Sequence, residues 1–217
     1  MLNLALKHFI KLKCTSTKLN RNMNRFLVLF IAILLCGYTF AIEGKMYKFE
    51  YLTTEDGLSQ STIEGLYQDS RGYIWIGTRD GANVFDGKNF KVFTHNSKDT
   101  NSIGEGWVNG FCEDYLGNVW IGTNSGISIY DYSLNKIRRI PRNLPGGSGK
   151  ISSIAKSSDN KMWFGLSGRY ELACYDIDKD EYTIFNFESV NTSPSANIFD
   201  ILFTKSDRMF LATESDE

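Results

Sequence analysis

The amino-acid sequence predicts an all-β protein made of four-stranded antiparallel sheets, which are the blades of a β-propeller. The first observation is composition. The 217 residues include 4 Trp, 11 Tyr and 15 Phe with 19 Gly and only 3 Pro, a balance typical of strands joined by tight turns. The second is a motif that recurs about every 45 residues. The third is that each of the three complete repeats contains four short apolar runs, which is the pattern of a propeller blade.

The recurring motif places one aromatic residue in each repeat, followed by a small residue two positions later. Its four copies read DSRGYIWIGT at 69–78, DYLGNVWIGT at 114–123, SSDNKMWFGL at 157–166 and TKSDRMFLAT at 204–213. The residues that anchor the repeat are Trp75, Gly77, Trp120, Gly122, Trp163, Gly165 and Phe210. The aromatic anchors are separated by 45, 43 and 47 residues. Such regular recurrence predicts rings that pack between blades rather than rings that stack on a ligand.

Each strand of the first repeat follows from its local sequence. The apolar run at 63–67 predicts the first strand, and the run at 73–76, apolar on both faces, predicts a second strand packed between neighbouring sheets. The Asp-Gly pair at 80–81 predicts a tight turn. An aromatic-Asp pair at 85–86 ends the third strand, and the run at 90–93 supplies the fourth. The same succession recurs in the later repeats.

The repeats divide residues 42–217 into about three and a half blades of an incomplete propeller. The predicted blades span residues 57–96, 102–144, 148–189 and 195–217, the last of them truncated. Propellers close as rings of about four to eight blades. An open arc leaves an apolar face and a sheet edge uncovered. We therefore expect further blades or a second chain to complete the ring.

The first 41 residues are basic and contain six Lys or Arg but no acidic residue. An apolar run at 26–36, followed by small residues before a cleavage point after Ala41, predicts a signal peptide at 23–41. The run is shorter than the roughly 20 residues that span a bilayer, so an uncleaved anchor is the weaker interpretation. Residues 1–22 form a basic extension, which is either a misassigned start ahead of Met23 or a targeting presequence.

Residues 42–217, which we call the body, have a charge and a histidine and cysteine content that exclude several function classes. Residues 42–217 carry 18 basic and 25 acidic side chains, and a net charge of −7 excludes nucleic acid as a partner. His95 is the single histidine of the body, which leaves no material for a histidine triad or a His-rich metal site. Cys112 and Cys174 lie in apolar runs and are predicted to be small buried residues, with a disulfide between them left open. We expect no catalytic residue, no metal and no cofactor.

The motif D-x-x-G-x-[IV]-W-I-G-T, followed by G-[IA]-x-x-[FY]-D, resembles the two-component-regulator propeller repeat. That repeat occurs in the periplasmic part of hybrid sensor histidine kinases of Bacteroides and related bacteria. The segment at 49–59, FEYLTTEDGLS, is similar to the opening segment of those sensors. The resemblance runs from about Phe49 to Thr213. The third repeat departs from the family pattern by lacking the Gly-Thr pair, and the fourth by replacing Trp with Phe.

The resemblance implies an extracytoplasmic, periplasmic ligand-sensing segment of a two-component sensor. In this family the ligand is a glycan fragment, and further blades, a membrane helix and a kinase follow the repeats. The chain itself has no kinase motif, so we expect no catalysis here. We also expect contact with a membrane only through the leader or through later parts of the parent protein.

Two other functions fit a propeller. One is a secreted lyase or glycosidase, which needs convergent acids or a His/Tyr pair. The other is a scaffold for protein–protein interaction. Trp107 lies in a loop, outside the positions of the aromatic anchors, and is the candidate for a ligand contact. The acids at 69, 114 and 159 recur once per blade and are predicted to cap turns.

Overall fold

The computed structural model describes residues 30, 48–141, 143–167, 171–186 and 198–213. The predicted extension at 1–22 lies outside these residues, and so does the predicted signal peptide at 23–41 apart from Phe30. The chain divides into two compact units, Met1–Phe49 and Glu50–Glu217, and every strand that the structure describes belongs to the second. Within the described ranges, no helix has both the length and the apolar character needed to cross a membrane.

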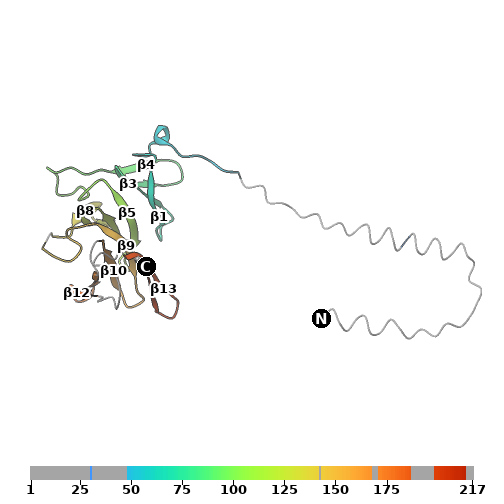
Figure 1. Cartoon of the computed structure of the whole chain (residues 1–217). Coiled ribbons are helices and arrows are strands. Elements are labelled where there is room, and N and C mark those ends of the chain that lie inside the picture. Colours follow the sequence, from blue (N-terminus) through green and yellow to red (C-terminus); the bar gives the residue numbers. More distant parts are fainter. Residues whose placement is uncertain (1–29, 31–47, 142, 168–170, 187–197, 214–217) are drawn as a thin grey trace, which may run out of the picture. The chain divides into compact units, whose positions relative to one another are not determined.

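Three antiparallel sheets of four strands, which we call blades 1, 2 and 3, form most of the second unit (Figure 1). Blade 1 consists of β1 (Ile63–Gln68), β2 (Ile74–Thr78), β3 (Gly81–Phe85) and β4 (Phe90–Phe93). Blade 2 consists of β5 (Val108–Glu113), β6 (Val119–Thr123), β7 (Gly126–Asp131) and β8 (Lys136–Arg139). Blade 3 consists of β9 (Ile151–Lys156), β10 (Lys161–Leu166), β11 (Glu171–Asp176) and β12 (Glu181–Asn186).

A fourth sheet, blade 4, has two described strands, β13 (Ile198–Phe203) and β14 (Met209–Thr213). In every blade, strands that follow one another in the sequence are antiparallel neighbours. A short 3-10 helix, η1 (Thr54–Asp56), precedes blade 1. The predicted all-β fold of incomplete propeller blades is thereby confirmed.

The first strands of the blades lie next to one another in chain order. β1 contacts β5, β5 contacts β9, and β9 contacts β13, so each blade packs face to face on the next (Figure 1). The aromatic side chains between them point toward the following blade: Trp75 contacts Phe111 of blade 2, and Trp120 contacts Tyr175 of blade 3. The stack is therefore directional along the sequence.

The glycine two residues after each tryptophan permits this close packing. A Cβ atom at Gly77 would lie 2.7 Å from the backbone oxygen of Val108, the first residue of β5. At Gly165 it would lie 2.9 Å from the Cβ atom of Ile198, the first residue of β13. Real Cβ atoms do not approach other atoms so closely, so the glycines fit the first strand of the next blade against the second strand of the preceding one.

The hydrophobic core is divided into clusters that lie between successive blades. The cluster between blades 1 and 2 includes Trp75, Val108, Phe111, Ile121 and Tyr130. The cluster between blades 2 and 3 includes Trp120, Ile151, Phe164, Ala173 and Tyr175. The cluster between blades 3 and 4 has a buried part of three residues, Leu172, Ile198 and Ile201. Each interface thus has its own core.

The outer faces of the first and last blades expose apolar residues at positions that are buried elsewhere in the stack. Leu66 in β1 is 70% exposed, whereas Phe111, at the same position of β5, is 7% exposed. Phe210, at the position of the tryptophans, is 56% exposed because no described sheet covers that face of blade 4. Packing of the aromatic anchor between blades therefore holds for Trp75, Trp120 and Trp163 but not for Phe210 within the described residues.

Candidate functional site

A buried carboxylate fixes the tryptophan of each of the first two blades. Asp69 lies in the turn between β1 and β2, and its Oδ2 atom accepts a 2.9 Å hydrogen bond from Nε1 of Trp75. Its Oδ1 atom accepts bonds from the backbone N–H groups of Arg71 and Tyr73, both at 3.0 Å. Asp114 makes the same bond to Trp120, also at 2.9 Å. These acids therefore organise the turn and hold the indole ring in place.

The third blade uses a different residue, which corrects one expectation from the sequence. Ser157, not Asp159, occupies the position of Asp69 and Asp114, and its Oγ atom accepts a 3.1 Å bond from Nε1 of Trp163. Asp159 instead accepts hydrogen bonds from Ser157 Oγ and Lys161 Nζ. The hydrogen bond to Lys161 lowers the pKa of Asp159. A serine hydroxyl can take the place of the carboxylate because the Trp163 indole N–H needs only one hydrogen-bond acceptor.

A polar network joins blade 1 to blade 2 around the same turn. Tyr132, which follows β7, donates its hydroxyl to Asp69 Oδ2 of blade 1. Burial, and then this bond to a carboxylate, raises the pKa of Tyr132. The Arg71 guanidinium lies 3.9 Å from the centre of the Tyr132 ring and 3.2 Å from the buried Glu113 carboxylate. Ser70 Oγ donates a 2.6 Å bond to the same carboxylate. The two blades are therefore joined by charge-assisted bonds as well as by apolar contact.

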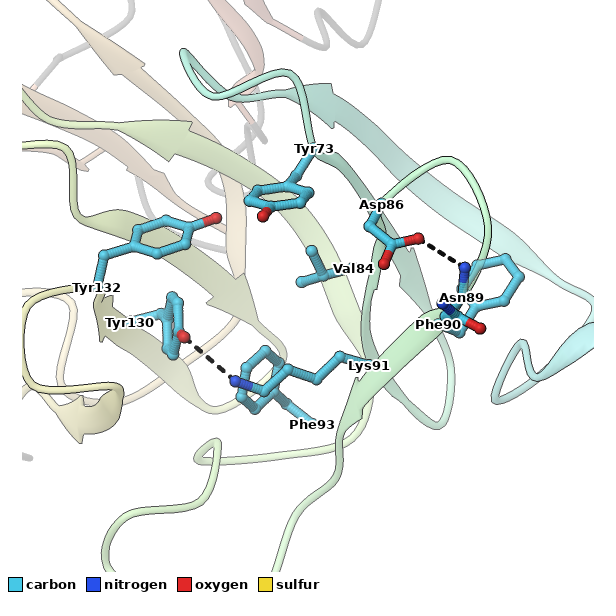
Figure 2. Close-up of a pocket in the computed structure, with 9 residues that line it drawn as sticks. All are labelled: Tyr73, Val84, Asp86, Asn89, Phe90, Lys91, Phe93, Tyr130 and Tyr132. Atoms are coloured by element: carbon cyan, nitrogen blue, oxygen red, sulfur yellow. Dashed lines mark hydrogen bonds between the residues drawn. The ribbon is translucent and has the colours of Figure 1, made fainter.

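Beside this network, blades 1 and 2 line an open cavity of about 360 Å³, which we call the blade 1–2 cavity (Figure 2). The volume lies in the range of about 300–1,000 Å³ that is usual for small-molecule sites. β3, β4 and the turn between them supply Val84, Asp86, Asn89, Phe90, Lys91 and Phe93. Tyr73 precedes β2, and Tyr130 and Tyr132 come from the end of β7. Five of these nine side chains are aromatic.

The aromatic rings of the cavity are held in defined orientations. Tyr73 and Tyr132 are stacked, with ring centres 6.4 Å apart and planes 14° apart. Tyr130 packs against Phe93 with ring centres 5.0 Å apart and against Tyr132 at 4.7 Å. The Tyr130 hydroxyl donates a 2.7 Å bond to Asn135 Oδ1. Because neighbours fix these rings, the cavity wall exists before any ligand arrives.

Lys91 is the cation of the cavity. Its Nζ atom lies 3.2 Å from the Tyr130 hydroxyl and 2.9 Å from Asn135 Oδ1, and both partners are uncharged. Figure 2 shows the side chain reaching across the cavity toward Tyr130. The nearby Asp86 carboxylate accepts bonds from the backbone N–H groups of Asn89 and Lys88. The bond from Asn89, followed by the bond from Lys88, lowers the pKa of Asp86. Both bonds hold the carboxylate against the turn between β3 and β4.

Trp107, the residue that the sequence singled out for ligand contact, lies at the other end of the strands. The Arg79 guanidinium is 4.3 Å from the centre of its ring, and Arg79 also pairs with Glu64 at 2.7 Å. The backbone oxygen of Trp107 accepts a hydrogen bond from the backbone N–H of Asn124. Trp107 is half-buried and does not line the blade 1–2 cavity. In its loop, Glu105 Oε2 is buried without a partner among the described residues.

The two cysteines and the one histidine of the body lie in surroundings that give them no reactive role. Cys112 and Cys174 are free and buried, and burial raises the pKa of the first thiol to about 12 and of the second to about 11. Thiols that remain protonated are poor nucleophiles. His95 is exposed, and its Nδ1 atom lies 2.9 Å from the backbone oxygen of Ile103. Within the described chain, no group of three or more His, Cys, Asp or Glu side chains could hold a metal ion.

Sequence reasoning did not find the blade 1–2 cavity, although one signal of it was present. The aromatic-Asp pair that ends each third strand was interpreted only as a strand end. In blade 2 this pair is Tyr130-Asp131, and a further tyrosine follows it at 132. The structure brings these two tyrosines to the edge of β4 in blade 1, about 40 residues away in the sequence.

Two segments of the chain match a known family of repeats. Residues 57–80 and 102–125 match the family described as two component regulator propeller. These segments contain the tryptophans and the buried aspartates of blades 1 and 2. The two matched segments contain the copies of the repeat motif at 69–78 and 114–123, in which every specified motif residue is present.

The chain is also similar to parts of longer proteins. Histidine kinase P4 of Formosa agariphila is 39% identical over 83 residues, which is 38% of this chain and 6% of that protein. The extracellular domain of a protein described as a hybrid two-component system of Bacteroides thetaiotaomicron superposes with a TM-score of 0.62 at 22% identity, covering 75% of this chain and 23% of that one. A catalytically inactive virginiamycin B lyase variant from Staphylococcus aureus superposes with a TM-score of 0.53 at 13% identity, covering 74% and 50%. The chain thus spans less than a quarter of the first two proteins.

Proposed function

We propose that this chain of two-component regulator propeller repeats is an extracytoplasmic sensing segment of a two-component sensor. The match of residues 57–80 and 102–125 to that family is the observation that carries the proposal. The basic, acid-free leader supports export to the periplasm. Similarity to the histidine kinase of Formosa agariphila supports a kinase as the parent protein, although the matched part is a small share of it.

The proposed mechanism is a change in blade packing when ligand binds. A ligand can shift an equilibrium between two packings only by binding one of them more tightly. The interfaces described here are dense, with glycines that leave no room for a Cβ atom, so small displacements at one interface affect its neighbours. By family resemblance the ligand is an oligosaccharide, and no step of catalysis belongs to this chain.

The parent protein can be tested first from its gene. We expect the reading frame to continue beyond codon 217 into more Trp-x-Gly repeats, a membrane helix and a histidine kinase. A stop codon at that point, followed by unrelated sequence, would contradict a sensor parent and favour a propeller that is completed by a second chain.

The sensing step is tested on the full-length sensor in membrane vesicles. We expect at least one oligosaccharide of a broad panel to change autophosphorylation from radiolabelled ATP and to give heat in calorimetric titration. If no sugar changes phosphorylation or gives heat, the glycan ligand is refuted. Activity with a non-glycan ligand would retain the sensor and replace the ligand class.

The secreted lyase or glycosidase is the alternative from another class. It predicts turnover of a polysaccharide by the purified chain, measured as new reducing ends or as loss of substrate. The described residues offer little for such chemistry, because His95 is exposed and its ring nitrogen faces a backbone oxygen. A protein-interaction scaffold predicts instead a stable protein partner and no response to small ligands.

A further inference from the structure

We propose that the blade 1–2 cavity binds a small ring compound that carries a carboxylate. The inference deepens the proposed sensing function and rests on it for its biological meaning. Binding itself follows from the chemistry of the cavity, which combines flat aromatic walls with one cation.

The walls of the cavity favour a flat or ring-shaped body. Phe90, Phe93 and three tyrosines line it, and apolar surface buried against such rings provides most of the affinity in small-molecule sites. The stacked rings of Tyr73 and Tyr132 form one side (Figure 2). Tyr73 is 36% exposed, so part of its ring is open to an incoming ligand.

Lys91 gives the cavity a position at which an anion can bind. The ammonium group of Lys91 has three donors, and its two hydrogen-bond partners in the described chain are the uncharged oxygens of Tyr130 and Asn135. No carboxylate of the described residues pairs with it. A ligand carboxylate would therefore supply the missing counter-charge, whereas a second cation would be repelled.

The two nearest acids, Asp86 in the cavity wall and Asp131 beside it, are hydrogen-bonded within their own turns. Asp86 is bound to the N–H groups of Lys88 and Asn89, at 2.8 and 2.6 Å. Asp131 accepts bonds from Ser133 N–H and Oγ and from Leu134 N–H within its own turn. One oxygen of each carboxylate, Oδ1, is thus held by donors of its own turn, and neither acid is paired with Lys91.

The position of the cavity connects binding to blade packing. One wall comes from β3 and β4 of blade 1, and the other comes from the end of β7 in blade 2. Tyr132, on the second wall, also bonds to Asp69 in the core of the junction. A ligand that contacts both walls would stabilise the arrangement in which the two blades are seen here.

The test uses the purified 217-residue chain and three probes: glucuronate, benzoate and glucose. Glucuronate and benzoate share the ring and the carboxylate but come from different sources, a sugar acid and an aromatic acid, and glucose has the ring alone. Binding is measured by calorimetry and by chemical-shift changes. We expect at least one of the two acids to bind and glucose to bind about tenfold or more weakly, because hydrogen bonds to charged groups are the stronger ones.

Two variants and one control locate the site. Lys91→Met is expected to weaken binding of the acid by about tenfold to a hundredfold, and Tyr73→Leu is expected to weaken every probe that binds. Lys98→Met removes an exposed lysine on the connection between β4 and β5 and is expected to change nothing. Thermal unfolding of each variant checks that the fold persists.

The outcomes separate the site from the sensing function. If neither acid binds, if glucose binds as tightly as the tighter of the two acids, or if Lys91→Met binds that acid as the wild type does, the inference is overturned. Binding that depends on Lys91, without any effect on phosphorylation by the full-length sensor, would retain the site and contradict its role in sensing.

Discussion

At the scale of single residues, the buried aspartate of the first blade's turn joins the turn backbone, the tryptophan and the next blade. Asp69 accepts bonds from four donors: the Trp75 indole, two backbone N–H groups and the Tyr132 hydroxyl. A carboxylate can serve all four because both of its oxygens are acceptors. An amide cannot, because one end of it carries donors.

We therefore predict that Asp69→Asn lowers the free energy of unfolding by about 2–3 kcal/mol, the cost of leaving buried donors without an acceptor. The measurement is urea denaturation followed by tryptophan fluorescence. Asp159→Asn is the matched control, because its side chain is 49% exposed and surface ion pairs contribute about 0–1 kcal/mol. Equal unfolding midpoints for the two variants would contradict the assigned role of Asp69.

The same residues show how far sequence reasoning reaches. The aspartates at 69 and 114 could be predicted as turn caps because the turn chemistry is local. The third blade was misjudged because an acid lies two residues after the true position, and the sequence does not say which side chain faces the indole. Tyr132 could not be predicted, since its partner Asp69 belongs to another blade.

At the scale of elements, the glycine of the second strand sets how closely two blades approach. A Cβ atom at Gly77 would meet backbone, the Val108 oxygen at 2.7 Å, which cannot turn away as a side chain can. A Cβ atom at Gly122 would meet the side chains of Ile151 and Ile154 at 3.0 and 3.1 Å. In β5, Gly110 has nothing within 4 Å of its ideal Cβ position.

This difference predicts an order of stability among three Gly→Ala variants. Gly77→Ala is expected to lower the free energy of unfolding by about 2–3 kcal/mol, through overpacking, and Gly122→Ala by less. Gly110→Ala is expected to stay within about 0.5 kcal/mol of the wild type. Chemical denaturation of the three variants checks the order. A Gly110→Ala variant as unstable as Gly77→Ala would contradict the assignment of this order to the space between blades.

The strands themselves were largely predictable, whereas the cavity was not. Apolar runs, Asp-Gly pairs and a constant period are local or periodic signals, and they place each strand within its blade. The blade 1–2 cavity depends on how far β4 of one blade stands from β7 of the next. That distance is set by side chains packed between sheets, and no sequence period reports it.

At the scale of the whole molecule, the exposed apolar residues of the two outer faces are the main feature. Leu66 on blade 1 and Phe199, Leu202 and Phe210 on blade 4 are each more than half exposed. Exposed apolar patches of this kind favour association. We expect further blades of the parent protein or a second copy to cover them.

We predict that the isolated chain self-associates with rising concentration, as measured by sedimentation velocity. The double variant Leu66→Lys with Phe210→Lys should remain monomeric over the same range, because a charge at either face opposes burial. Leu134→Lys, in the turn between β7 and β8, is the matched control, since Leu134 is 65% exposed but lies on neither outer face. A wild-type chain that stays monomeric throughout would contradict the prediction.

The directional packing of the blades also limits the symmetry of any such assembly. The tryptophan side of one blade always receives the first strand of the next, so the face of blade 4 is complementary to the face of blade 1 and not to itself. Contacts between copies would therefore be heterologous, joining head to tail. If the rotation from copy to copy divides a full turn evenly, such contacts close into a ring, and otherwise they grow into a helical filament. A two-fold dimer would instead need a face that is complementary to itself.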